Sequence, residues 1–253
     1  MTKLAAISLL AVSAFAERTP RDLEGVGVEE KLGQKIDMEL KFTSASGRIV
    51  RLGDYFNQGK PVVITMVYFS CPMLCNMVLN GFTSLLRELP WSPGSEFDVL
   101  TISIDPRETF ELAAAKKQTY LASYDRPAPG WRFLTDLGGT SKLLAEQLGF
   151  HYRYNDSLGQ YAHSAAFFVL TPDGRISRYV YGIKYKVRDF RLAVTEASEL
   201  KVGSTLDKLL LYCFRYDAHS NGYVMYAMNL MRVGSAAGVI ALSAMIWKLR
   251  MAE

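Results

Sequence analysis

Residues 62–75 of this chain read VVITMVYFSCPMLC. Residues 62–69 form a nearly unbroken run of apolar and β-branched side chains, which is typical of a strand buried on both faces of a sheet. From residue 76 to residue 89, apolar side chains recur at helical spacing, so we expect a helix there. Cys71 and Cys75 therefore lie where a central strand leads into a helix.

Strands and helices are expected to alternate along the rest of the domain. The expected strands are 38–43, 48–52, 97–104, 131–134, 165–170 and 175–181, and the expected helices are 108–123, 140–148 and 187–201. This order predicts an α/β fold in which helices flank a mixed sheet, with an N-terminal β-hairpin extension formed by the first two strands.

Length and composition exclude several classes of protein. The chain has 253 residues, 21% of them charged, and a net charge of +4 that is spread without runs of like sign. A disordered chain would have fewer apolar residues, and a nucleic-acid-binding protein would concentrate its positive charge. Three cysteines in a chain of this size do not form the disulfide framework of a small secreted domain. We expect one domain, residues 17–203.

Both ends of the chain indicate a membrane. Residues 1–16 have a positive start, a short apolar run and an A-x-A site, which predicts a signal peptide. Residues 223–248 are apolar and end in Trp247 and Lys248, which predicts a transmembrane helix after a juxtamembrane segment at 204–222. The predicted location is a bacterial-type inner membrane, with the domain facing the periplasm or cell exterior and residues 249–253 in the cytoplasm.

The two cysteines carry the strongest chemical signal in the sequence. Backbone amides at the start of a helix stabilise a thiolate, the form of cysteine that binds metal or attacks a disulfide. Cysteines four positions apart, as Cys71 and Cys75 are, fall about one helical turn from each other. Such a pair can hold a soft Cu(I) ion or can close into a disulfide.

His163 directly precedes the expected strand 165–170. An isolated histidine is more often a hydrogen-bonded surface or core residue than a metal ligand. In a thioredoxin-like arrangement, however, the loop before this strand faces the helix start that carries the cysteines. Imidazole there would complete a site of two cysteines and one histidine that suits copper, including Cu(II).

Three blocks of the sequence resemble the signatures of the Sco/SenC family of copper-binding assembly factors for cytochrome c oxidase. They are Val67-Tyr68-Phe69-Ser70-Cys71-Pro72-x-x-Cys75, Ser103-Ile104-Asp105-Pro106 and His163-Ser164. The resemblance implies a thioredoxin fold, copper held by Cys71, Cys75 and His163, and delivery of copper to the dinuclear site of oxidase subunit II. It also implies a thiol–disulfide role in keeping the cysteines of that subunit reduced.

The chain departs from the family in two respects. Many members have Pro-Asp-Val-Cys-Pro where this chain has Pro72-Met73-Leu74-Cys75-Asn76, and many are anchored at the N-terminus rather than the C-terminus. The first departure changes side chains next to the predicted ligands and so bears on the fine tuning of the metal site. The second bears on how the site is placed relative to the membrane surface. Neither removes a predicted ligand.

Four other residues are weaker candidates. Asp105 could support the site or could simply cap a turn. Met73 could offer a thioether to copper, although an apolar side chain that covers the site is the simpler role. Cys213 and His219 lie near the predicted anchor, where an odd cysteine can pair between chains or bind metal.

Three functions fit these observations. The first is a copper metallochaperone that binds Cu(I), Cu(II) or both. The alternative is a membrane-anchored thiol–disulfide oxidoreductase in which Cys71 and Cys75 form the redox pair. The third is a copper or redox sensor that acts through a partner. Dedicated oxidoreductases usually have two residues between their cysteines, and exchange has no need of a histidine, so the sequence favours copper.

Overall fold

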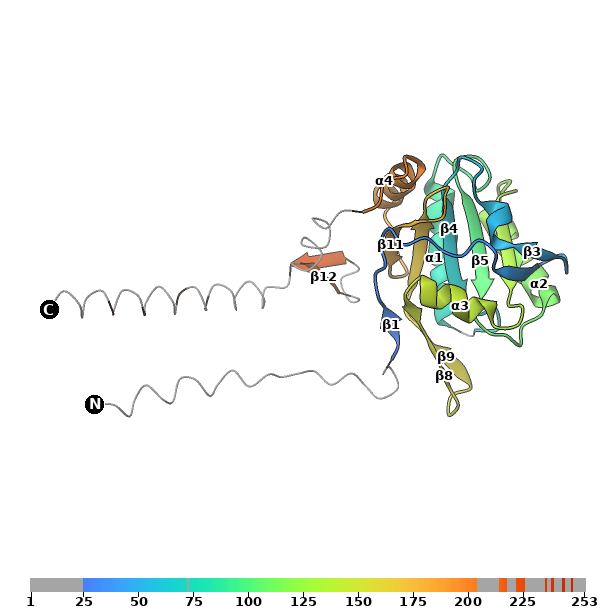
Figure 1. Ribbon diagram of the computed structural model, residues 1–253, viewed down its shortest axis with the longest axis horizontal. Coiled ribbons are helices and arrows are strands. Elements are labelled where there is room, and N and C mark those ends of the chain that lie inside the picture. The colour runs from blue at the N-terminus through green and yellow to red at the C-terminus, as the bar shows by residue number, and fades with distance from the viewer. Residues whose placement is uncertain are drawn as a thin grey trace.

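The computed structural model (Figure 1) describes residues 25–71, 73–203, 214–217 and 222–225, with the single positions Ser235, Gly238, Ser243 and Trp247. Its central sheet has seven strands in the order β11-β10-β4-β5-β6-β2-β3. These strands are β2 (Lys41–Ser44), β3 (Ile49–Arg51), β4 (Val62–Val67), β5 (Asp98–Ser103), β6 (Trp131–Thr135), β10 (Ala166–Leu170) and β11 (Ile176–Tyr181). The helices are α1 (Leu74–Glu88), α2 (Phe110–Tyr124), α3 (Thr140–Gln147) and α4 (Val187–Ser198), with a short 3-10 helix at Leu52–Tyr55.

The sheet is mixed, as the sequence predicts. Strands β4, β5 and β6 run parallel, while β10 and β2 add antiparallel strands on either side. All residues of β4 and β5 are buried, which explains the nearly continuous apolar run of β4. The buried hydroxyls of Thr65 and Thr101 bond to each other at 2.9 Å, and the Trp131 indole donates to Thr101 at 3.0 Å, so these polar groups are satisfied.

Helices cover both faces of the sheet. On one face, the ring of Phe82 in α1 contacts Trp131 of β6, Phe167 of β10 and Phe190 of α4. The next residue along β10 points to the opposite face, where Phe168 contacts the ring of Phe150. Helix α3 lies beside β7 (Phe150–His151) on that second face. The predicted arrangement of a mixed sheet between helices is therefore confirmed.

A glycine lets the chain pass close to α1. A Cβ atom on Gly81 would lie 1.9 Å from the carbonyl oxygen of Ile183, in the segment between β11 and α4. Only a residue without a side chain permits this approach. The segment that leads into α4 thus packs directly on the helix that carries Cys75.

The predicted N-terminal hairpin exists, but it is part of the main sheet. Strand β2 pairs with β3 and also with β6, where Thr43 lies opposite Thr135 and Ser44 opposite Leu134. The hairpin is therefore an edge of the sheet rather than a separate extension. Strand β3 is therefore one of the two edge strands of the sheet.

Three further strand pairs are not in the prediction from sequence. They are β1 (Gly27–Val28) with β7, β8 (Arg153–Asn155) with β9 (Gln160–Ala162), and β12 (Phe214–Asp217) with β13 (Gly222–Met225). Strands of two to four residues are too short for a recognisable alternation of apolar and polar side chains. The β8–β9 hairpin projects from the sheet (Figure 1).

The predicted membrane segments remain predictions. Among the described positions, no helix has the length and apolar character needed to cross a bilayer. The predicted signal peptide at 1–16 lies outside the described residues, as does most of the predicted span at 223–248. Residues 222–225 are described as strand β13, which pairs with β12.

Candidate functional site

Cys71 and Cys75 lie at the carboxyl end of strand β4. Cys71 lies in the loop that follows the strand, and Cys75 lies in the first turn of α1. The backbone amide of Cys75 donates a hydrogen bond to the Cys71 sulfur at 3.3 Å. Amides in the first turn of a helix have no partner within the helix, so this one is free to bind the sulfur. Both side chains are buried, with 5% of Cys71 and 1% of Cys75 exposed to solvent.

His163 contacts Cys75 although 88 positions separate the two residues. Its Nε2 atom lies 3.0 Å from the Cys75 sulfur, and its Nδ1 atom lies 2.9 Å from the carbonyl oxygen of Ser164. Because a carbonyl oxygen only accepts, Nδ1 carries the proton in this bond. Nε2 is therefore the ring nitrogen that faces the Cys75 sulfur, and it is the nitrogen that a metal ion would bind.

The two cysteines have opposite acidities. The pKa of Cys71 is lowered, first by a hydrogen bond from the Cys75 side chain and also by bonds from His163 and Tyr68, which together outweigh its burial. Burial raises the pKa of Cys75, and its hydrogen bond to Cys71 raises it further. The pair therefore holds one thiolate, on Cys71, and one thiol, on Cys75.

Glu108 fixes the loop between β4 and the cysteines. Its carboxylate accepts hydrogen bonds from the backbone amides of Phe69 at 2.7 Å and Ser70 at 2.6 Å, and from the Ser103 hydroxyl at 2.6 Å. These bonds tie the loop to the end of β5. Sequence reasoning missed this role, because a glutamate at the start of the expected helix 108–123 suggests only a helix terminus.

Asn76 holds the same loop from the other side. Its amide nitrogen donates to the carbonyl oxygen of Cys71 at 2.9 Å. Its amide oxygen accepts from the Lys116 ammonium at 3.1 Å and the Tyr120 hydroxyl at 3.4 Å. The residue that departs from the family pattern after Cys75 thus links the cysteine loop to α2.

Asp105 supports the site only indirectly. Its carboxylate binds the Arg107 guanidinium through two bonds, of 2.9 and 2.7 Å. Burial acts to raise the pKa of Asp105, but its hydrogen bonds to Arg107 and Tyr161 keep that pKa low. The Tyr161 ring packs edge-on against Tyr68 with ring centroids 5.4 Å apart, and Tyr68 packs on His163.

Met73, Cys213 and His219 are the other weaker candidates, and Met73 is expected from the sequence to cover the site. Met73 does not cover the thiols, because 65% of it is exposed, and Met77 is exposed too. Cys213 and His219 lie outside the described residues.

The structure brings all three predicted ligands to one place but leaves the site incomplete. Cys75 contacts His163, and Cys71 is held beside Cys75. Within residues 25–71 and 73–203, however, no three His, Cys, Asp or Glu side chains have the spacing of an assembled metal site. The donors, two sulfurs and an imidazole nitrogen, suit a soft or borderline ion. Binding such an ion through all three requires the Cys75–His163 hydrogen bond to open.

The sequence and fold have recognisable relatives. Residues 28–189 match the model of the SCO1/SenC family. No curated protein is significantly similar in sequence.

Three solved structures illustrate the similarity of fold. A protein from Aquifex aeolicus VF5 is 20% identical, with a TM-score of 0.59 over 68% of this chain and 96% of its own. ScoI of Arabidopsis thaliana, solved with copper bound, is 18% identical, with a TM-score of 0.51 over 64% of this chain and 96% of its own. BsSco, described as a member of the Sco family of cytochrome c oxidase assembly proteins, is 19% identical, with a TM-score of 0.52 over 69% of this chain and 99% of its own. At these identities the similarity concerns the fold.

The unequal acidities predict unequal pH dependence of alkylation. An ordinary thiol has a pKa of about 8.5. The pH at which iodoacetamide alkylates Cys71 at half its maximal rate should lie below about 8.5, because the pKa of Cys71 is lowered in the folded protein. The corresponding pH for Cys75 should lie above about 8.5, because its pKa is raised. Mass spectrometry of the labelled peptides measures both midpoints. In Cys75→Ala the midpoint of Cys71 should rise, and a lower midpoint for Cys75 than for Cys71 would contradict the assignment.

Loss of the Glu108 carboxylate should loosen the cysteine loop. In Glu108→Gln an amide nitrogen would face backbone donors, so we expect the free energy of unfolding to fall by about 1.5–3 kcal/mol. Urea unfolding measures this change, and both cysteines should also be alkylated faster. Glu88→Gln is the matched control, because Glu88 is exposed at the end of α1. Equal stability of the two variants would exclude the role of Glu108 in holding the loop.

Proposed function

The chain belongs to the SCO1/SenC family, and we propose that it is a copper metallochaperone whose ligands are Cys71, Cys75 and His163. The observation that carries the proposal is the position of His163 Nε2, 3.0 Å from the Cys75 sulfur and oriented by the bond from Nδ1 to Ser164. A hydrogen bond to the second ring nitrogen is what fixes histidine as a ligand in metal sites.

The chemistry of the three donors explains how the site would accept copper. Cys71 is already the thiolate of the pair, so it can take the ion first. Cys75 must then lose its proton, and His163 must give up its hydrogen bond to Cys75 before Nε2 can bind. Two thiolates favour Cu(I), and the imidazole extends the site to Cu(II). The Arabidopsis relative, solved with copper bound, supports the choice of metal.

The proposed recipient is the dinuclear copper site of cytochrome c oxidase subunit II. The support is the family and the description of BsSco as an oxidase assembly protein. Such a recipient fits the proposed location, in which a signal peptide and a C-terminal anchor at 223–248 hold the domain on the periplasmic or outer side of the inner membrane.

A thiol–disulfide oxidoreductase is the second candidate. The observation that favours it is the direct contact of the two cysteine side chains, with the Cys75 amide also bound to the Cys71 sulfur. In this mechanism the Cys71 thiolate attacks a partner disulfide and forms a mixed disulfide with one of the partner's sulfurs. Cys75 then attacks the Cys71 sulfur, so that a Cys71–Cys75 disulfide forms and the partner leaves with both of its cysteines reduced.

Copper binding should depend on His163 and not on His151. Loaded under reducing conditions, the wild-type chain and His151→Ala should each retain one copper, whereas His163→Ala and Cys71→Ser should lose it. His151 is the matched control, because it lies on β7 and its imidazole faces Glu29 rather than the cysteines. Metal analysis after desalting measures the stoichiometry. Full retention by His163→Ala would refute the three-ligand site.

Thiol–disulfide exchange should survive the loss of His163. Only sulfur atoms react when Cys71 and Cys75 exchange with a glutathione redox buffer, so His163→Ala should still form and reduce the Cys71–Cys75 disulfide. Its rate should shift to higher pH, because the bond from His163 lowers the pKa of Cys71. Mass spectrometry of trapped thiols follows the reaction. A folded variant that lost exchange and copper binding to the same degree would disprove this separation of roles.

A further inference from the structure

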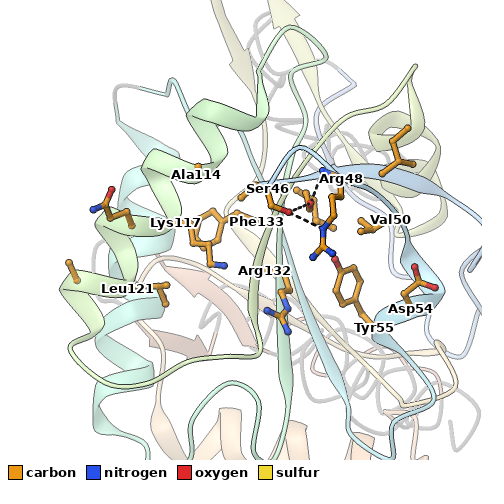
Figure 2. A pocket seen from close by; sticks show the side chains of 16 residues that line it. Ser46, Arg48, Val50, Asp54, Tyr55, Ala114, Lys117, Leu121, Arg132 and Phe133 are labelled. Carbon is orange, nitrogen blue, oxygen red and sulfur yellow. Dashed lines mark hydrogen bonds between the residues drawn. The ribbon is translucent and has the colours of Figure 1, made fainter.

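A hollow of about 920 Å³ lies on the side of the sheet covered by α2, away from the cysteines. Its walls come from the β2–β3 hairpin, strand β6 and helix α2 (Figure 2). The volume falls within the range of ligand-binding pockets, which is about 300–1,000 Å³. None of its lining residues belongs to the cysteine loop or to the segment that carries His163.

Three positively charged side chains from three different elements face this hollow. Arg48 comes from the turn of the hairpin, Lys117 from α2 and Arg132 from β6. Figure 2 shows their nitrogen-bearing ends directed toward the same space. We call this set the cationic hollow. Like charges that converge repel one another, so the fold alone does not favour this arrangement.

The cationic hollow has little negative charge of its own. The acidic side chain in its lining is Asp54, and Asp54 is held by the Arg51 guanidinium and backbone amide, both at 3.0 Å. Within the part of the chain that the structure describes, none of the ion pairs involves Arg48, Lys117 or Arg132. The three cations therefore have hydrogen-bond donors to offer an anion.

The charges also act on one another and on Tyr55. Burial lowers the pKa of Lys117, and the proximity of Arg132 lowers it further. Burial raises the pKa of Tyr55, whereas Arg132 and Arg48 both act to lower it. The Tyr55 side chain is thus within electrostatic reach of two of the cations, and Figure 2 shows it on the same side of the hollow as Arg48 and Arg132. An anion bound here would relieve the repulsion between Lys117 and Arg132.

Part of the remaining wall is apolar. Val50, Leu121 and Phe133 line the hollow beside the charged groups. Ligand pockets commonly combine apolar walls with a few polar groups that fix orientation. We propose that the cationic hollow binds a small organic ligand that carries a phosphate or carboxylate on an apolar body.

Phenyl phosphate is a suitable probe, because it joins a dianion to an apolar ring. Titrated into the full-length chain and followed by calorimetry, it should bind saturably and more weakly as salt is raised. Lys117→Gln/Arg132→Gln should weaken binding by about tenfold or more, since two charge-assisted contacts are lost. The matched control is Lys142→Gln/Lys184→Gln, which removes the same charge at exposed positions and should bind like the wild type.

Two further compounds test the two parts of the proposed ligand separately. Inorganic phosphate carries only the anionic group, and benzyl alcohol carries only the apolar ring. Phenyl phosphate should bind more tightly than either one, because it alone satisfies the cations and the apolar wall. Equal affinity for phenyl phosphate and inorganic phosphate would overturn the apolar part of the proposal. The absence of saturable binding, or equal weakening in the control variant, would overturn the site itself. Copper stoichiometry should be unchanged in Lys117→Gln/Arg132→Gln, so failure here is distinct from failure of the proposed function.

Discussion

The contact between Cys75 and His163 depends on the antiparallel pairing of β10 with β4. The cysteines follow the last residue of β4, and His163 precedes the first residue of β10, so the pairing brings the two ends to the same edge of the sheet. A slip of one residue would exchange Phe167 and Phe168 between the two faces, and the rings packed around each would oppose it. The register of two buried strands thereby sets the position of the histidine.

Within that frame, hydrogen bonds set the state of Cys71, and burial and hydrogen bonding together set that of Cys75. The Ser164 carbonyl orients the imidazole, the imidazole faces the Cys75 thiol, and the Cys75 amide and thiol both bind the Cys71 sulfur. The bonds form a series that leads from the histidine to Cys71, so a change at one end alters the acidity at the other. Metal binding and disulfide chemistry would both begin at Cys71. In the proposed function the histidine binds the metal, whereas in disulfide exchange it would act only through the acidity of Cys71.

Much of this arrangement can be predicted from the sequence, and the limits have physical causes. Long periodic runs such as 62–69 predict their strands, and the strand-to-helix position of the cysteines follows from them. His163 becomes a candidate only once the fold is assumed. The bonds of Glu108 to residues 69 and 70 and the cationic hollow depend on tertiary contacts between distant segments, which leave no local pattern. The strands β8 and β9 are too short to show any.

Burial of the proposed ligands would limit how copper enters and leaves the site. Cys71 is 5% exposed and Cys75 only 1%, so no acceptor protein can reach both sulfurs while the loop is closed. The loop is held chiefly by side-chain bonds from Glu108 and Asn76 to its backbone, and each such bond contributes only about 0.5–3 kcal/mol. Opening the loop would therefore cost far less than disrupting the buried strand before it, because local segments can open without global unfolding. Well-positioned sulfurs on a loop that is held by a few such bonds are what the proposed metallochaperone function requires, because a carrier must both hold its ion and release it to an acceptor.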